Sequence, residues 1–410
     1  MRLNRYNLTF AGLLSLHLLL LFFMINDFSI SAKEADIYFK NISLISFKEF
    51  FSNNIILIFL TNLSTDLFGQ NDIALRLPFI LFYVGSSILL YLLTDDYFKS
   101  QWDRVLTIAI FMMLPGVNSA ALLVNESIIV VFFTLLYLYL YKLKEKEHYY
   151  LLILFLFIDN SFAILFLSLF FYSMKKKDNT LLFTSLILFG VSMTIYGFEI
   201  GGRPRGYFLD TFAVYATIFS PLMFLYFFYS LYRVGLKGEK DMYWYISMTA
   251  LFLSLLFSLR QKIDIEDFAP FVVIAIPIMV KLFMHSIRVR LKEFRQKHYI
   301  AGTIVISVLV LNFFVFIFNK YLFLIIENPA KHIAYKHYIA KELSNQLKAK
   351  NIYNIKVEEK GMAKRLKFYH IKNNEDNYKL VDNLNTKEKI NIKYKDKIVK
   401  SYGLIRNNYR

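Results

Sequence analysis

The stretches LLSLHLLLLFFM at residues 13–24 and IIVVFFTLLYLYLY at residues 128–141 are almost wholly apolar on every face. Strands of a membrane barrel are shorter and alternate apolar with polar residues, so these stretches predict helices that cross a bilayer. The composition agrees, because 57% of the 410 residues are hydrophobic and 43 are Phe, more apolar surface than one water-soluble core of this length can bury. We therefore expect an all-α polytopic membrane protein.

Similar apolar runs recur along the first 325 residues, and they predict about eleven transmembrane helices. The predicted spans cover residues 7–26, 74–94, 103–120, 126–143, 148–159, 161–174, 179–197, 213–233, 242–259, 268–285 and 299–325. The fifth and sixth are short and meet at Asp159 and Asn160, so they can also form one interrupted helix. No small-residue cleavage site follows the first span, which we interpret as a membrane anchor.

Much of the positive charge lies in alternate loops between these spans. The basic loops contain Lys142, Lys144 and Lys146; Lys175, Lys176 and Lys177; Arg233, Lys237 and Lys240; and Arg288, Arg290, Lys292, Arg295 and Lys297. Together with Arg2 and Arg5 they form a positive-inside pattern, which predicts a cytoplasmic N-terminus in the inner membrane of a bacterium. The net charge of +17 thus follows topology, and we expect no nucleic-acid partner.

We predict two domains, and an odd number of spans places the second domain on the side of the membrane opposite to the N-terminus. Residues 1–326 are expected to form the transmembrane module, with an outward loop at residues 27–73 that contains an interfacial helix near residues 48–67. Residues 327–410 are expected to form a small C-terminal α/β extracytoplasmic domain in the periplasm. It would begin with a helix at residues 332–350 and continue with alternating stretches such as residues 391–399.

Short motifs follow one another in a characteristic order along the spans. They are AKEADIY at residues 32–38, LFG at 67–69, ALRLP at 74–78, LPG at 114–116, VNES at 124–127, SP at 220–221, Arg260 with Lys262, FAP at 268–270, and Pro277. This ordered set resembles the GT-C superfamily of lipid-linked-sugar glycosyltransferases. The similarity is to bacterial members related to protein O-mannosyltransferases and to the aminoarabinose transferase of lipid A. Where the family usually has an Asp-Glu pair, this chain has Lys33 and Glu34.

The resemblance implies a membrane enzyme that transfers a sugar from a polyprenyl-phosphate donor to an envelope acceptor, either lipid A, a glycan or a protein. The donor already carries a good leaving group, so the protein has to activate the acceptor and hold the departing phosphate. Asp36 or Glu34 is the expected base; in a strand the two would share a face, and in a helix they would diverge. Glu126 matches a second acidic position of the family, where it would assist the acceptor or bind a metal.

The expected phosphate-binding residues are cations of the outward loops, because guanidinium groups match phosphate oxygens. They are Arg203, Arg205, Arg260 and Lys262, with Arg76 as a further candidate. Arg76 has a second interpretation, in which it pairs with Asp72 and orients the start of the second span. No cofactor follows from the sequence: Asp264, Glu266 and Asp267 could offer oxygen ligands to a divalent cation, but their spacing specifies no metal.

Each candidate also has a plainer interpretation, and the whole chain has other possible functions. The carboxylates can be solvated loop residues, and the cations can contact lipid headgroups. A flippase, polymerase or other transporter of lipid-linked glycans would have a similar number of spans, but it would place charges or broken helices near the bilayer midplane. A GT-C scaffold that has lost catalysis is the third possibility, and Lys33 is the residue that favours it.

Overall fold

The computed structural model describes residues 5–40, 55–197, 205–332, 334–374, 378–382 and 388–406. Arg203 and the first part of the expected interfacial helix lie outside these ranges. The described chain forms two compact units. Unit 1 comprises residues 5–18, 55–56 and 79–313, and unit 2 comprises residues 19–40, 57–78 and those from 314 onward. The predicted domain boundary falls at residue 326, whereas unit 2 combines the C-terminal segment with two segments from near the N-terminus.

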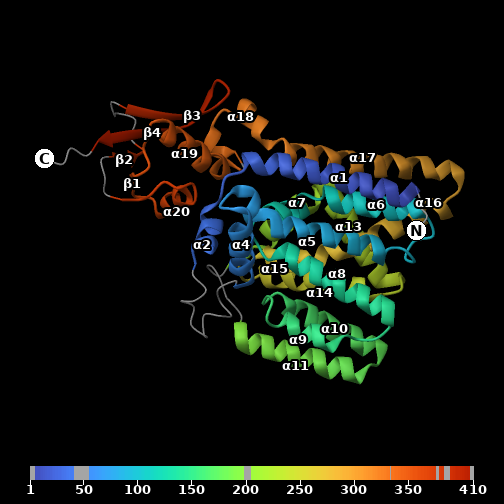
Figure 1. The fold of residues 1–410 in the computed structure, drawn as a ribbon. Coiled ribbons are helices and arrows are strands. Elements are labelled where there is room, and N and C mark those ends of the chain that lie inside the picture. The colour runs from blue at the N-terminus through green and yellow to red at the C-terminus, as the bar shows by residue number, and fades with distance from the viewer. Residues whose placement is uncertain are drawn as a thin grey trace. The chain divides into compact units, whose positions relative to one another are not determined.

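Unit 1 is a bundle of helices (Figure 1). It contains the first part of α1 (Arg5–Asp27) and most of α5 (Asp72–Leu93). The other helices are α6 (Gln101–Met113), α7 (Pro115–Leu122), α8 (Ser127–Lys144), α9 (Tyr149–Phe155), α10 (Phe162–Lys176), α11 (Asn179–Tyr196), α12 (Phe208–Phe219), α13 (Pro221–Lys237), α14 (Met242–Ser258), α15 (Ile265–Val272), α16 (Ile276–Val289) and α17 (Lys292–Ile317).

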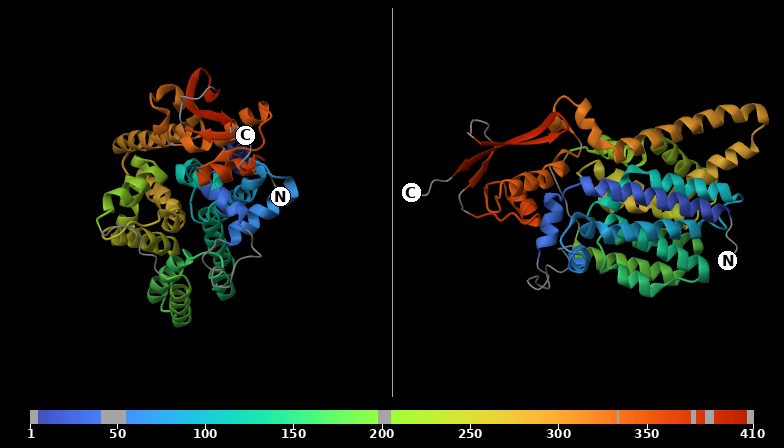
Figure 2. Two further views of the ribbon diagram at one scale, coloured as in Figure 1. Left: turned by 90° about the vertical axis from the view of Figure 1, so that its left-hand side faces the viewer. Right: turned by 45° about the horizontal axis from the view of Figure 1, so that its top comes forward.

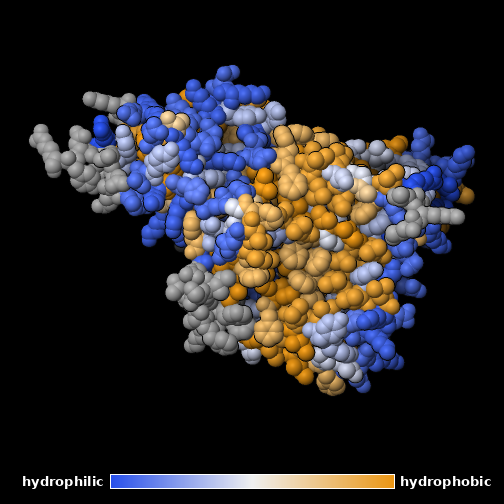
Figure 3. Space-filling model, viewed as in Figure 1, coloured by the Kyte–Doolittle hydropathy of each residue, from blue (hydrophilic) through white to orange (hydrophobic). Residues whose placement is uncertain are grey.

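Six helical segments of the described chain are long and apolar enough to cross a membrane. They are Arg5–Asp27, Asp72–Leu93, Ser127–Lys144, Asn179–Tyr196, Ile265–Val289 and Lys292–Ile317. Two bent pairs of helices raise this number to as many as 8. Hydrophobic side chains cover much of the helical surface seen in Figure 3, and α11 exposes Phe183 and Ile187 on its outer face. The multi-pass membrane architecture is therefore confirmed, whereas the count of eleven spans is not.

Three of the predicted spans correspond to the shorter helices α9, α10 and α14, of 7, 15 and 17 residues. Two others are interrupted at prolines. The predicted span at 213–233 is two helices, α12 and α13, which meet at an angle of 106°. The predicted span at 103–120 is likewise divided into α6 and α7, with a bend of 59°. Pro221 and Pro115 open the second helix of each pair, and the residues before them are not helical. Proline has no N–H to donate and disfavours helical geometry in the preceding residue, so each helix has to restart there.

Unit 2 contains a small α/β fold in its C-terminal part. The helices of unit 2 are α2 (Ala32–Phe39), most of α4 (Ile55–Phe68), α18 (Leu322–Ile325), α19 (Ala340–Ala349) and α20 (Lys360–Phe368). A sheet in the order β1-β2-β4-β3 is formed by Lys356–Val357, Tyr378–Val381, Lys397–Arg406 and Glu388–Tyr394. The first pair is parallel and the others are antiparallel. Figure 2 shows β3 and β4 as a long hairpin.

The expected α/β character of the C-terminal segment is thus confirmed, with two local differences. The helix begins at Ala340 and not at residue 332, because Tyr335–Tyr338 forms a 3-10 turn. The alternating stretch at 391–399 is not one strand: it contains the end of β3, a turn at Lys395 and the start of β4. Lys395 has a φ of 50°, a left-handed conformation that allows the chain to reverse within two residues.

Candidate active site

The acidic motif forms the short helix α2, whose start is fixed by its own sequence. Ser31 is the N-cap, and its Oγ accepts a hydrogen bond from the backbone N–H of Glu34 at 3.1 Å. In return, the Ser31 backbone N–H donates to Glu34 Oε2 at 2.7 Å. This reciprocal capping box satisfies two donors at the helix start. Because the segment is helical, Glu34 and Asp36 point to different sides, as expected for that case.

Glu34 lies on the buried side of α2 and is bound to Arg76. The Arg76 Nη2 atom lies 3.3 Å from Glu34 Oε2, and the two side chains are 0% and 3% exposed. Arg76 also donates to the carbonyl oxygens of Phe28 at 2.9 Å and Ser29 at 3.3 Å. A second carboxylate, Asp72, lies 3.8 Å from Arg76 Nη1. This geometry supports the orienting role of Arg76 and leaves its guanidinium group no exposed surface for a phosphate.

Residues of the C-terminal segment complete the network around Asp72. Tyr369 donates its hydroxyl to Asp72 Oδ1 at 2.7 Å, and Lys341 Nζ lies 2.8 Å from Asp72 Oδ2. The Tyr369 oxygen in turn accepts the backbone N–H of Ile30 at 3.0 Å. Burial, together with the neighbouring Asp72 charge, raises the pKa of Tyr369, so its phenol keeps the proton that it donates. Asp72 therefore connects α5, the acidic motif and the C-terminal segment.

The backbone ahead of α2 is held by the same C-terminal segment. Arg365, which is buried, donates from Nε to the Ile30 carbonyl oxygen at 2.8 Å and from Nη2 to the Lys336 carbonyl oxygen. Ser29 donates both its N–H and its hydroxyl to the His337 carbonyl oxygen, each at 2.7 Å. The segment that leads into the acidic helix is thus fixed on both its N–H and C=O groups.

Asp36 lies on the opposite, solvent-exposed side of α2. Its side chain is 48% exposed and forms an ion pair with Lys364 of α20. Of the two carboxylates that the sequence proposes as base, Asp36 is the one with surface on which an acceptor can be placed.

Glu126 and the other acidic candidates belong to unit 1. Glu126 is the half-buried N-cap of α8, and the next residue, Ser127, donates its hydroxyl to the Glu266 carbonyl oxygen at 3.2 Å. The charges of Glu126, Asp159, Asp264 and Glu266 all act on the Asp267 carboxyl, so these residues lie near one another. Within the described ranges, however, no group of three or more carboxylate or imidazole side chains has an arrangement that could hold a metal ion.

The expected phosphate-binding cations also lie in unit 1, on two neighbouring loops. The backbone N–H of Tyr207 donates to the Ser258 carbonyl oxygen at 2.7 Å, which brings the loop of Arg205 beside that of Arg260. Arg205 lies over the Tyr207 ring at 4.7 Å, and Arg205, Arg260 and Lys262 are all exposed. These three cations are therefore accessible to an anionic headgroup.

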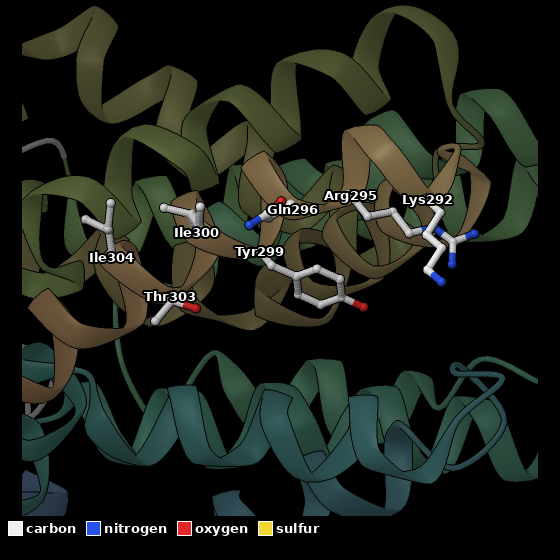
Figure 4. A pocket seen from close by; sticks show the side chains of 7 residues that line it. All are labelled: Lys292, Arg295, Gln296, Tyr299, Ile300, Thr303 and Ile304. Carbon is white, nitrogen blue, oxygen red and sulfur yellow. The ribbon is translucent and has the colours of Figure 1, made fainter.

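A pocket of about 580 Å³ lies along α17, also in unit 1. Figure 4 shows the residues that line it, namely Lys292, Arg295, Gln296, Tyr299, Ile300, Thr303 and Ile304. Arg295 is used locally, because it donates to the carbonyl oxygens of Arg290 at 2.7 Å and Arg288 at 3.1 Å and so closes the turn between α16 and α17. The site residues expected from the sequence do not line this pocket.

The sequence did not indicate the residues of the C-terminal segment that contact the acidic motif. Tyr369, Arg365, Lys341 and Lys364 lie about 300 residues from their partners, and nothing in a single sequence relates positions so far apart. One signal was available for α2 itself: Ser31 followed three residues later by Glu34 is the pattern of a capping box.

Comparison with known proteins agrees with the motifs of the first spans. Residues 53–159 match the family described as dolichyl-phosphate-mannose-protein mannosyltransferase. This range contains the motifs at residues 67–69, 74–78, 114–116 and 124–127. Among solved structures, the crystal structure of ArnT from Cupriavidus metallidurans in the apo state resembles the chain. Its TM-score is 0.49 with 11% sequence identity, and the match covers 87% of this chain and 73% of that one. No curated protein matches the chain. Residues 53–159 are therefore similar to a family of the kind that the sequence motifs resemble, the GT-C glycosyltransferases, and this similarity covers about a quarter of the chain.

Proposed function

We propose that this protein is a membrane glycosyltransferase that transfers a sugar from a polyprenyl-phosphate donor to an envelope acceptor at the outer face of a bacterial inner membrane. The acceptor class is lipid A, a glycan or a protein. The observation that carries the proposal is the separation of the two carboxylates of α2. Glu34 is buried and bonded to the Ser31 backbone and to Arg76, whereas the Asp36 carboxylate of the same helix is accessible.

In this proposal Asp36 is the general base. It accepts the proton of the acceptor hydroxyl as that oxygen attacks the anomeric carbon, and the bond to the donor phosphate breaks. The phosphate that leaves carries the negative charge, and cations can stabilise it. In unit 1, Arg205, Arg260 and Lys262 stay candidates for binding an anionic headgroup, as does Arg203 from the sequence. Glu126 stays a candidate for assisting the acceptor, as the sequence resemblance implies.

The proposed orientation places the N-terminus in the cytoplasm and the C-terminal segment in the periplasm. Polar contacts between helix ends of unit 1 that carry basic residues support this orientation. Lys176 at the end of α10 lies 3.4 Å from Glu147, and Lys175 donates to the Lys240 carbonyl oxygen at 2.8 Å. Arg288 at the end of α16 lies 2.6 Å from Asp103 at the start of α6. Hydrophilic residues mark the end of the bundle where α8 finishes, on the right of Figure 3. One basic end is what a positive-inside orientation requires.

Reporter fusions test this orientation. Alkaline phosphatase needs an oxidising compartment to form its disulfides, so a fusion after Lys350 should be active and one after Lys176 inactive. The reverse pattern would exclude an outward site on α2 and with it the proposed reaction at the outer face.

The decisive test of the function is Asp36→Asn. This change keeps the size and hydrogen bonding of the side chain but removes its charge and basicity, so transfer should fall by roughly 100-fold or more. Asp382→Asn is the matched control, because Asp382 is an exposed carboxylate of unit 2 that pairs with Lys400 at 3.1 Å. Mass spectrometry of envelope glycans and lipid A, in a strain lacking its own copy of the gene, provides the measurement. Wild-type modification in both variants would remove Asp36 from the mechanism.

A second candidate function is a GT-C scaffold that binds lipid or a partner protein without turnover. The specific observation that favours it is Lys33, which stands where the family has its first acidic residue and which is exposed on α2. Such a scaffold would show no change in envelope glycans or lipid A when its gene is deleted.

A further inference from the structure

The carboxylate of Asp36 faces a helix that carries only positive charge. In α20, Lys360, Lys364 and Lys367 are exposed and follow one another at intervals of four and three residues, which places them on one face of the helix. Lys364 pairs with Asp36, and Lys367 Nζ lies 4.3 Å from the centre of the Phe39 ring at the end of α2. The surface formed by Asp36, Lys360, Lys364 and Lys367 is called the lysine face below.

The pair between Lys364 and Asp36 is not what holds α2 and α20 together. Arg365, the next residue of α20, is buried and donates to the Ile30 carbonyl oxygen, and Tyr369 accepts the Ile30 N–H. The helices also approach closely at Gly361, where an added Cβ would lie 3.3 Å from Cβ of Ala32. An ion pair as exposed as Lys364 with Asp36, at 50% and 48%, adds little to such a junction. The position of Lys364 beside the proposed base therefore needs a reason other than stability.

We propose that Lys364 is a phosphate-binding residue of the active site, and that a phosphate-bearing ligand takes Lys364 away from Asp36. This inference rests on the proposed function. The phosphate is either that of the polyprenyl donor or one on an anionic acceptor. The phosphodiester of the donor carries one negative charge on two free oxygens, as a carboxylate does, so it can replace Asp36 as the partner of the ammonium group. A phosphate monoester, as in the released lipid or on an anionic acceptor, carries more charge and offers more acceptor oxygens, so it competes better.

Through this exchange, the accessibility of the Asp36 carboxylate depends on whether a phosphate is bound to Lys364. Without ligand, Asp36 Oδ1 is paired with the ammonium group of Lys364, so only part of the carboxylate is open to an acceptor hydroxyl. When the phosphate occupies Lys364, both carboxylate oxygens of Asp36 are open to the acceptor hydroxyl, and Asp36 receives its proton. Lys367 lies one turn further along the lysine face and provides a second positive charge for the same anion. The C-terminal segment would thus contribute a ligand-binding group in addition to holding the acidic motif.

Binding measurements on the full chain in detergent test the proposal. The probes are farnesyl phosphate for the lipid phosphate that the donor releases, monophosphoryl lipid A for an anionic acceptor, and farnesol as the uncharged control. Lys364→Met should weaken binding of at least one phosphate probe by about 10-fold, which corresponds to about 1.4 kcal/mol. Lys364→Arg should retain most of the affinity, and farnesol should bind all variants alike. The matched control is Lys379→Met, since Lys379, which is half-buried, forms an ion pair at 2.6 Å with the exposed Glu358 in the same unit.

Asp36→Asn gives the opposite expected change. Because Asp36 competes with the ligand for Lys364, its neutral variant should bind the phosphate probe several-fold more tightly than the wild type does. If only farnesyl phosphate responds to Lys364→Met, the site holds the phosphate of the polyprenyl lipid. If only lipid A responds, the site holds the phosphate of the acceptor.

The outcome that overturns the inference is a Lys364→Met variant that binds both phosphate probes as tightly as Lys379→Met. If transfer nevertheless depends on Asp36, the proposed function stands and only the phosphate site is lost. If Lys364→Met weakens binding while Asp36→Asn transfers sugar normally, the phosphate site stands and the proposed base is wrong.

Discussion

The two sides of α2 show how differently two carboxylates of one short motif can be used. On the buried side, Glu34 closes the capping box and binds Arg76, and its side chain is 3% exposed. On the exposed side, Asp36 has one ion pair with a lysine that is itself half-exposed. Successive helical residues differ by about 100°, so two positions along α2 are enough to separate a structural carboxylate from an accessible one. Acidic residues within a motif are therefore not interchangeable candidates for the base.

The largest expected effect comes from breaking the buried side. Arg76→Met removes the partner of two buried carboxylates, Glu34 and Asp72, and should destabilise the protein by about 3–5 kcal/mol. Arg205→Met is the control, because Arg205 is an exposed arginine. Unfolding in detergent, followed by temperature or denaturant, measures both variants. Equal stability of the two would mean that the buried pair does not hold the acidic motif.

Exposed cations should respond in affinity and leave stability unchanged. Arg203→Ala, Arg205→Ala and Arg260→Ala should each weaken binding of the lipid-linked donor by roughly 1.5–3 kcal/mol where a charged hydrogen bond to phosphate is lost. At least one of the three is expected to do so, and thermal unfolding serves as the control measurement. Unchanged donor affinity in all three would assign these arginines to ordinary contacts with lipid headgroups.

The smallest effect is expected at Lys33, on the exposed face of α2. Lys33→Asp restores the usual acidic pair of the family and should change stability by less than about 0.5 kcal/mol, as surface substitutions usually do. An active enzyme should keep its transfer activity, measured by the same analysis of envelope glycans and lipid A. A loss of transfer in this variant would show that Lys33 itself takes part, and the comparison between the two sides of α2 would then have to include a third residue.

The membrane class of the fold could be predicted because a helix that is apolar on every side requires a long run of consecutive apolar residues, which is visible in the sequence. The interruptions at Pro115 and Pro221 were also visible in the sequence, but a count of apolar residues passes over a single proline. For the site, the pairing of Arg76 with Asp72 was predictable because both lie on one helix, four residues apart. Tyr369, Arg365 and Lys364 were not, since their contacts with the acidic motif depend on the packing of distant segments.

The contacts that hold the acidic motif also set an order of events during synthesis. Ser29 and Ile30 bind groups that follow 308, 335 and 339 residues later in the chain. Because the ribosome makes the N-terminus first, the early membrane segments are in place long before these groups exist. We therefore expect the acidic helix to acquire its final geometry only when the last part of the chain has been synthesised and folded, so that a nascent or truncated chain carries an unfinished site.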